Sequence, residues 1–288
     1  MNKPPDFAVI GGSGLYDIPG LSDTQEHDLE TPFGKPSAPV MTGILRNQKI
    51  AFLSRHGIGH QLSPGEVNYR ANIYALKKLG VQRVISVNAC GSLREDYKPG
   101  DLVIPHQLFD FTKNRTNTFF KGGLAAHIGT ADPFCKDLST HLLEAVNSTG
   151  ATVHDQGAFI TIEGPRFSTR SESNTFRTWG MSIIGMTTAP EAFLAREAEL
   201  CYASLAHITD YDVWHTSEEP VTVEMVLSII QQNTENVKET IQHLAANPMP
   251  SETSCACSQA LKNAVITDPE VIPEETRLKL ELLISKYL

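Results

Sequence analysis

The sequence predicts an α/β fold in a single domain with a C-terminal helical extension. The length of 288 residues allows one large α/β unit. Short β-branched runs alternate with amphipathic stretches, and no internal repeat or low-complexity tract divides the chain. The roughly forty residues that follow Pro248–Ser251 are too few for an independent core. We therefore expect residues 1–288 to form one domain, extended by helices from about residue 250.

Strands are predicted where short apolar runs rich in β-branched residues are bounded by polar residues or glycine. These runs are residues 7–10, 50–54, 83–87, 101–104, 157–162, 182–186 and 201–208. Helices are predicted where apolar residues recur at helical spacing and a start or stop residue bounds the run. These are residues 63–79, which Gly80 ends, 139–149, a helix from Pro190, 221–246, and a last helix from Pro273.

Composition excludes several classes of protein. A net charge of -9 with dispersed charges argues against a nucleic-acid binder, which would present a basic face. Only four apolar residues, Phe7–Ile10, precede the first glycines, too few for a signal-peptide core. No segment approaches membrane-spanning length, so we expect no membrane partner and a cytoplasmic location.

The five cysteines are too few and too scattered for a disulfide-dependent scaffold. The spacing of Cys255 and Cys257, with one residue between them, resembles that of a metal-binding or redox-active cysteine pair. No histidine or further cysteine lies close by in sequence to complete a zinc site, so no metal site is predicted. A disulfide that involves these two residues stays open.

Asp210 and Asp212 stand two residues apart at the end of the apolar run 201–209. In extended backbone such residues place their side chains on the same face. Burial and mutual repulsion would raise the pKa of at least one of the two carboxyl groups. This pair suits an aminopurine leaving group, which needs a proton at N7 and an acceptor for its exocyclic amine. A strand-end aspartate that caps a turn is the alternative for either residue alone.

Gly11-Gly12-Ser13-Gly14-Leu15 follows the first predicted strand. A dinucleotide fingerprint is excluded, because Asp17 occupies the position of the third glycine and Pro19-Gly20 interrupts the helix that should follow. A glycine loop that carries a hydroxyl can still bind an anion through its exposed N–H groups. A plain turn is the alternative.

Other strand ends carry small, hydroxyl or cationic residues. Arg55 can donate two parallel hydrogen bonds to phosphate oxygens, and His56 adds an imidazole whose pKa lies near neutral pH and shifts with its surroundings. Asn88–Ser92 and Met186-Thr187-Thr188 are further strand-end loops of this kind. Each motif alone is weak evidence. Together they indicate one crevice at a shared edge of the sheet.

The chain resembles the S-methyl-5'-thioadenosine phosphorylases of the trimeric purine nucleoside phosphorylase family. The resemblance runs in the family's order from residue 7 to beyond 225. The matching stretches are Ile10–Leu15, Thr31–Ser37, Arg55–Gly57, Val67–Asn72, Ala89–Arg94, Ile162–Ser168, Met186–Glu191 and Thr209–Trp214.

The resemblance implies a central mixed β-sheet that is distorted toward a barrel and flanked by helices. It also implies an active site that is shared between subunits. It implies phosphate contacts from Ser13, Arg55, His56, Asn88, Ala89 and Thr187. It implies nucleoside contacts from Phe167, Ser168, Met186, Asp210, Asp212, His60, Val223, Val226 and, from a neighbouring subunit, His127. A homotrimer or a dimer of trimers is expected, with phosphate as co-substrate and without metal or organic cofactor.

The implied reaction is phosphorolysis of S-methyl-5'-thioadenosine to adenine and 5-methylthioribose 1-phosphate, with Asp210 and Asp212 as the catalytic pair. Asn88 stands where many such enzymes carry threonine, whereas 6-oxopurine phosphorylases often have asparagine there. A purine nucleoside or methylthioinosine phosphorylase that acts on 6-oxopurines is therefore the alternative. A hydrolase and a non-catalytic binding protein are two further alternative functions. Both are disfavoured, because the residues of the anion site and of the acid pair are all present.

Overall fold

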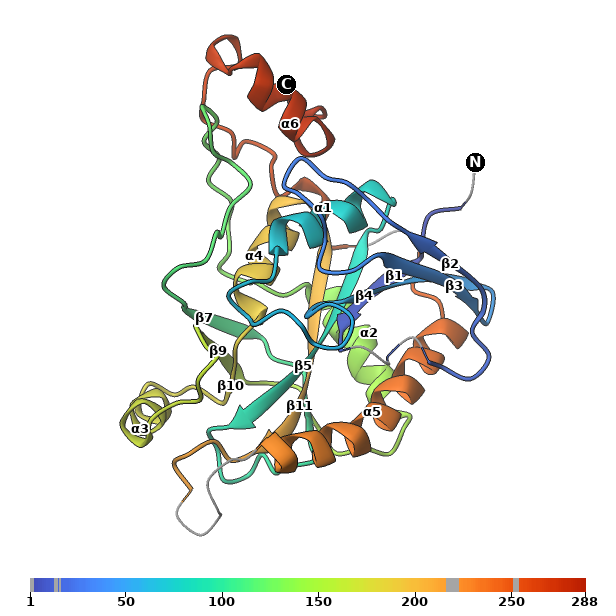
Figure 1. Ribbon diagram of the computed structural model, residues 1–288, viewed down its shortest axis with the longest axis vertical. Helices are drawn as coiled ribbons and strands as arrows, with labels where there is room; N and C mark the ends of the chain where they lie inside the picture. The colour runs from blue at the N-terminus through green and yellow to red at the C-terminus, as the bar shows by residue number, and fades with distance from the viewer. Residues whose placement is uncertain (1–2, 13–14, 16, 216–222, 251–253) are drawn as a thin grey trace.

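The computed structural model describes residues 3–12, 15, 17–215, 223–250 and 254–288, apart from the side chains of 223–232. The fold is a mixed β-sheet flanked by helices, as predicted (Figure 1). Its strands are β1 (Phe7–Gly11), β2 (Ser22–His27), β3 (Val40–Leu45), β4 (Gln48–Ser54), β5 (Arg83–Ser92), β6 (Leu102–Val103), β7 (Gln107–Phe111), β8 (Val153–His154), β9 (Ala158–Ile162), β10 (Ile183–Gly185) and β11 (Cys201–Asp210).

The strand order is β2-β3-β4-β1-β5-β10-β9-β7, and β11 pairs with both β5 and β6. The described strands do not close into a barrel, so the sheet is curved and branched but open. β4, β1, β5 and β11 run parallel to one another. Their carboxyl ends therefore lie on one edge of the sheet, which is where ligands bind in open α/β folds.

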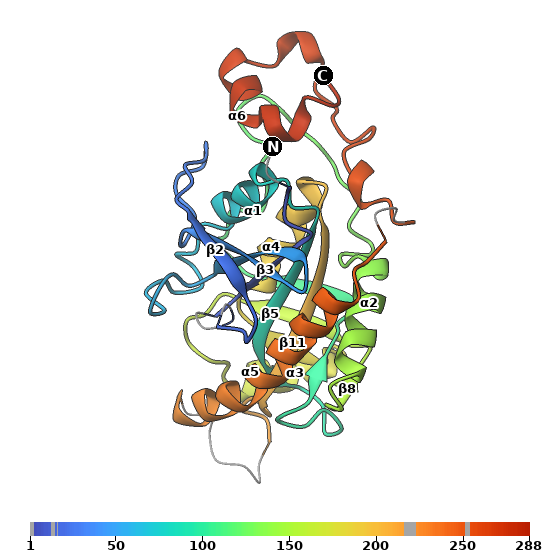
Figure 2. The same cartoon turned by 90° about the vertical axis from the view of Figure 1, so that its right-hand side faces the viewer.

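Helices cover both faces of these parallel strands (Figures 1 and 2). Alternate residues of β1 explain why: Ala8 and Ile10 belong to a core cluster under α1 and α4, whereas Phe7 and Val9 belong to a second cluster under α2 and α5. The helices are α1 (Tyr69–Lys78), α2 (Lys136–Asn147), α3 (Arg170–Thr178), α4 (Thr188–Glu197), α5 (Val223–Ala246) and α6 (Glu274–Ile284). None of the helices in the described part is both long and apolar enough to cross a bilayer.

Two of the predicted segments differ in kind or by several residues from the structure. The helix expected from residue 63 begins at Tyr69, because Ser63 closes a turn with Glu66 and the Asn68 side chain caps the helix by accepting from Ala71 N. The loop expected at 88–92 is instead the second half of β5. That half stays extended because β11 pairs with it as far as Gly91 and β10 pairs with Gly91 and Ser92.

The segment after α5 contains two 3-10 turns (Cys257–Gln259 and Pro269–Val271) and α6, and it extends away from the sheet (Figure 1). Its apolar residues, Leu261, Ile272, Leu280 and Leu283 among them, belong to the same buried cluster as residues of α1 and α4. We propose from this shared core that residues 1–288 fold as one domain with a C-terminal extension.

Candidate active site

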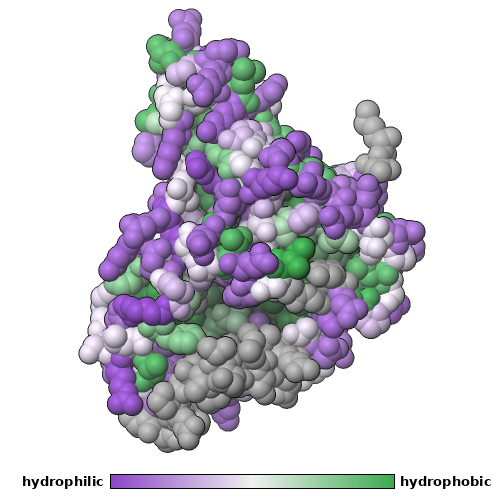
Figure 3. Space-filling model, in the orientation of Figure 1, coloured by the Kyte–Doolittle hydropathy of each residue, from purple (hydrophilic) through white to green (hydrophobic). Residues whose placement is uncertain are grey.

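The predicted strand-end residues meet at the carboxyl edge of the four parallel strands. Arg55 follows β4, Asn88 and Gly91 lie in the last five residues of β5, and Asp210 is the last residue of β11. In the orientation of Figure 1, the molecular surface is hollowed near its centre (Figure 3). These residues therefore lie at one edge of the sheet, where the sequence motifs were expected to converge.

Asp210 and Asp212 form a buried pair, each side chain about 9% exposed. The Thr209 hydroxyl donates to Asp210 Oδ2 at 2.6 Å, and the Asp212 N–H donates to Asp210 Oδ1 at 2.7 Å. Burial raises the pKa of Asp210 and raises that of Asp212 to about 6, with the Asp210 charge adding to the second shift. Asp212 Oδ2 is buried and has no partner among the described residues.

The predicted extended geometry of this pair is wrong. β11 is irregular between Ile208 and Asp210, and Asp212 has a φ of 51°, in the left-handed region. The two carboxyl groups are brought together by the turn in which Asp210 accepts from the Asp212 N–H. The expected rise in pKa nevertheless holds, because it depends on burial and not on strand geometry.

Gly91 leaves the space that this acid pair occupies. A Cβ at residue 91 would lie 2.9 Å from Asp210 Oδ1 and 3.2 Å from Asp212 Cβ. It would also lie 3.1 Å from Ile184 Cγ2. The backbone of β5 therefore approaches the carboxylates more closely than any other residue type allows.

Arg55 is held by a buried carboxylate that sequence reasoning did not assign. Its Nε donates to Glu191 Oε2 at 2.8 Å and its Nη2 to Glu191 Oε1 at 3.0 Å. Ser86 Oγ and the Val87 carbonyl accept two further N–H groups. These bonds use all but one of the guanidinium N–H groups, so Arg55 can offer a bound anion one direct donor together with its charge.

Glu191 is fully buried in α4, where hydroxyl groups of Ser86 and Tyr202 also donate to it. The Arg55 charge, together with these hydrogen bonds, outweighs burial and holds the pKa of Glu191 below its ordinary value. The pair is therefore an ionised, fully hydrogen-bonded unit beneath the site.

His56 lies at the same edge, half-buried, with Nδ1 2.9 Å from the Leu62 carbonyl oxygen. A carbonyl only accepts, so Nδ1 carries the proton and Nε2 is left as an acceptor in the neutral ring. Burial lowers the pKa of His56 to about 4, and the Arg55 charge adds to this. His60 is exposed and stacks on this ring, with centroids 4.3 Å apart.

Asn88 joins β5 to the start of α4. Its amide donates to Ser86 Oγ at 3.0 Å and to Ser204 Oγ at 2.9 Å, and its Oδ1 accepts from the Thr187 hydroxyl at 3.1 Å. The amide is thus occupied by the protein and positions Thr187. Ala89 is the exposed residue of an otherwise covered stretch of β5.

The loop after β9 carries the residues expected at the nucleoside. Phe167 is 42% exposed, whereas Ser168 is buried and its hydroxyl has no partner in the described part of the chain. Arg115 fastens this loop: it donates to the carbonyls of Glu163 and Met186 and pairs with the Glu163 carboxylate. Met186 is thereby fixed beside the loop.

The described part of the chain does not include every predicted site residue. Ser13 lies outside the described residues, as do the side chains of Val223 and Val226 in α5. His127 is exposed on the segment that pairs with the C-terminal extension, where its N–H donates to the Ala264 carbonyl. It does not contribute to the strand-end cluster of its own chain.

Sequence reasoning missed Glu191, Arg115 and Gly91. Glu191 stood in a matching stretch, at the start of a predicted helix, but nothing in its neighbours indicated that it would be fully buried. Arg115 lies in a stretch without periodicity. Gly91 is one of 20 glycines, and only the register of β5 against β11 explains it.

Comparisons with known proteins identify the family of this chain. The sequence profile of the Phosphorylase superfamily matches residues 6–246. The chain is 53% identical over 283 residues to the S-methyl-5'-thioadenosine phosphorylase of Geobacter sulfurreducens, covering 98% of this chain and 99% of the relative. It is 49% identical over 264 residues to the enzyme of that name from Hyperthermus butylicus, covering 91% and 96%.

Two solved structures share the fold over most of the chain. A methylthioadenosine phosphorylase from an antarctic soil metagenomic library has a TM-score of 0.93 at 43% identity, covering 97% of this chain and 99% of that one. The methylthioadenosine phosphorylase of Schistosoma mansoni in complex with adenine has a TM-score of 0.85 at 37% identity, covering 90% and 98%.

The mixed open sheet, with its acid pair and buried arginine at one edge, is a fold of the nucleoside phosphorylase type. The chain belongs to the Phosphorylase superfamily.

Proposed function

We propose that this chain catalyses the phosphorolysis of S-methyl-5'-thioadenosine, yielding adenine and 5-methylthioribose 1-phosphate. The observation that carries the proposal is the buried pair Asp210 and Asp212, whose carboxyl pKa values are both raised, at the edge where Arg55 supplies a positive charge. The names of the similar proteins support the substrate.

Phosphate binds next to Arg55, with His56, Thr187 and the backbone at Ala89 as further contacts and Ser13 completing the site. Because Glu191, Ser86 and the Val87 carbonyl together take four of the five Arg55 N–H donors, the guanidinium acts chiefly as a fixed positive charge in a buried position. Neutral His56 presents Nε2 to a P–OH group of the anion. Inorganic phosphate is thus a co-substrate, and the cycle requires no further cofactor.

The bond changes are as follows. A phosphate oxygen attacks C1' of the ribose while the C1'–N9 bond breaks, with an oxocarbenium-like transition state. The electron pair of that bond leaves with adenine, and protonated Asp210 donates a proton at N7. The proton that hydrogen phosphate loses on forming its ester returns to Asp210. Asp212 accepts a hydrogen bond from the 6-amino group.

Selectivity for a 6-aminopurine follows from the unpaired Asp212 Oδ2. A 6-oxo group would set an acceptor against this acceptor, at a cost of about 1–3 kcal/mol, or roughly ten- to hundredfold in rate. The Asp212→Asn variant should therefore shift preference toward 6-oxopurines.

The test compares methylthioadenosine, methylthioinosine, adenosine and inosine with and without phosphate. Adenine release from methylthioadenosine that depends on phosphate supports the proposal. Release without phosphate would identify a hydrolase, and an unchanged base preference in Asp212→Asn would refute the polarity argument.

We further propose a cytoplasmic homo-oligomer, a trimer or a dimer of trimers, in which His127 reaches the 5' end of a nucleoside bound by a neighbouring copy. His60, Val223 and Val226 would form the pocket for the methylthio group. The exposed position of His127, away from the strand-end cluster of its own chain, supports this arrangement. Sedimentation gives the oligomeric state, and a His127→Ala variant should raise KM for methylthioadenosine.

A further inference from the structure

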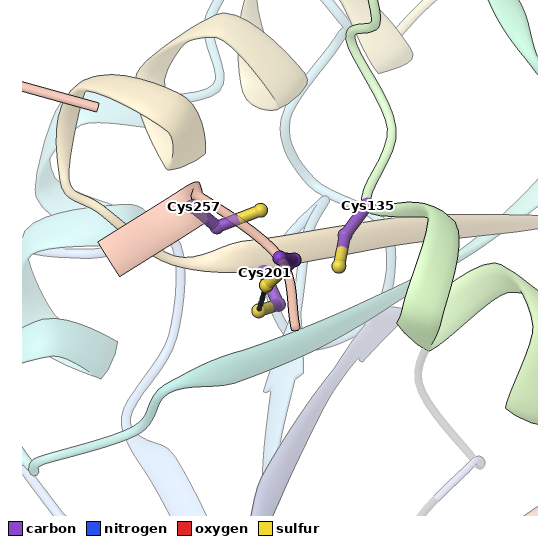
Figure 4. Close-up of side chains that lie close together, drawn as sticks. Cys135, Cys201 and Cys257 are labelled. Atoms are coloured by element: carbon purple, nitrogen blue, oxygen red, sulfur yellow. Dashed lines mark hydrogen bonds between the residues drawn. The ribbon is translucent and has the colours of Figure 1, made fainter. Parts of the chain in front are cut away.

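Four cysteines that are distant in sequence meet at one place in the fold, well apart from the acid pair. Cys135 precedes α2, Cys201 begins β11, and Cys255 and Cys257 belong to the C-terminal extension. Their sulfur atoms all lie within 4.8 Å of one another. Figure 4 shows the sulfurs of Cys135, Cys201 and Cys257 directed into a common space.

The spacing of these sulfurs matches a tetrahedral metal–thiolate centre. With Zn–S bonds of about 2.3 Å, sulfurs at the corners of a tetrahedron lie about 3.8 Å apart. The Cys201 and Cys255 sulfurs lie 3.4 Å apart, and all the others stay within 4.8 Å. A disulfide would need a separation of about 2.05 Å. Shifts of up to about 0.5 Å for each sulfur would bring all four into bonding distance of one ion.

The surroundings suit the negative charge of such a centre. Four thiolates around a divalent ion leave two excess negative charges, and Arg196 Nη1 already donates to Cys257 Sγ at 3.3 Å. Cys135 is the N-cap of α2, so the positive end of that helix faces the cluster. Cys135, Cys201 and Cys257 are buried, which shields the site from water.

We propose that Cys135, Cys201, Cys255 and Cys257 form a structural zinc site that fastens the C-terminal extension to the body of the fold. The two ligands on the extension are separated by Ala256 alone, and the other two come from α2 and β11. The prediction of no metal site considered only neighbours in sequence. Tertiary structure supplies the two ligands that were missing there.

The site has a structural consequence for the extension. Beyond Cys257, Val265 forms a bridge with Ala126, and the His127 N–H donates to Ala264 O. Metal bound at the cysteines would thus restrain the segment that holds His127. The metal proposal does not depend on the proposed reaction, and its test does not measure activity.

The experiment uses the full chain, purified with a reductant and without chelators. Elemental analysis should find about one zinc per chain. Replacement by Co²⁺ should give the intense visible bands of a tetrahedral ion and a near-ultraviolet thiolate charge-transfer band. Zinc should also raise the thermal unfolding midpoint of the apoprotein.

A Cys255→Ser/Cys257→Ser double variant should lower metal content at least about tenfold and abolish the thermal shift. Cys90→Ser is the matched control, because Cys90 is also buried but lies outside the cluster. It should keep full metal content. If the double variant does not fold, the Co²⁺ spectrum of the unaltered chain decides alone.

Three results would overturn the proposal. One is a reduced chain that takes up neither zinc nor Co²⁺. Another is a Co²⁺ spectrum with only weak octahedral bands. The third is a thiol count showing that these cysteines form disulfides in the chain purified under reducing conditions.

Discussion

Replacing Gly91 with alanine tests the geometry of the acid pair with one added methyl group. The φ of Gly91 is not in the left-handed region, so alanine fits the backbone of β5. The new Cβ, however, would lie 2.9 Å from Asp210 Oδ1, where ordinary contact begins at 3.4 Å. The carboxylate must therefore retreat by about 0.5 Å, and Ile184 on the other side also blocks the methyl group.

The displacement of the Asp210 carboxylate determines how far the rate should fall. Asp210 Oδ1 also accepts from the Asp212 N–H, so both acids move together. A misplacement of about 1 Å at a catalytic group costs about a hundredfold in rate, so half of that distance should cost about tenfold or more. Overpacking should lower the free energy of unfolding by only about 1–3 kcal/mol, which leaves the chain folded.

The assay is phosphate-dependent release of adenine from methylthioadenosine, measured as kcat/KM, with the thermal midpoint recorded in parallel. Gly65→Ala is the control, because its Cβ would meet nothing closer than Glu163 Oε1 at 3.9 Å. Gly65→Ala should leave kcat/KM within about twofold of the unaltered chain. A Gly91→Ala variant that is folded and equally active would show that the acid pair does not act from this position.

Three further predictions concern charge. Burial raises the pKa of Asp212 to about 6, and the ionised carboxylate accepts from the 6-amino group more strongly than the protonated acid does, so kcat/KM should fall as the pH drops through that value. The fall should vanish in Asp212→Asn, and a fall that persists would contradict the assignment. Glu191→Gln leaves the buried Arg55 charge without its partner and should lower the free energy of unfolding in urea by about 3–5 kcal/mol, whereas Asp28→Asn at an exposed pair should change it by less than about 1 kcal/mol; equal effects would refute this reasoning. Arg115→Met removes the hydrogen bonds that hold the loop after β9, so it should raise the KM for nucleoside roughly tenfold while the KM for phosphate stays constant. A change in the KM for phosphate alone would contradict the role of Arg115 in positioning the nucleoside loop.

Much of the sheet could be read from the sequence. Buried parallel strands are nearly continuous apolar runs, and β1, β4 and β11 begin within two residues of their predicted starts. The strands at the margin were missed. β2 reads Ser-Asp-Thr-Gln-Glu-His and is almost wholly exposed, so its strand state depends on pairing with β3 and leaves no apolar pattern.

Residue types at strand ends suggested the chemistry of the proposed site: Asp210 and Asp212 as acidic groups, and Arg55 as a cation at the same sheet edge. Their protonation states could not be read in the same way. Burial sets the carboxyl pKa values, and burial results from packing among β5, β10 and β11, which are distant along the chain.

Sequence by itself therefore determined the fold class, the strands of the central sheet and the kinds of group at the proposed site. Only the tertiary structure decided which groups are paired. Glu191 holds Arg55 across 136 residues of chain, Gly91 makes room for Asp210, and Cys135 and Cys201 join Cys255 and Cys257. Such contacts depend on strand register and helix docking, whereas sequence patterns report only on neighbours along the backbone.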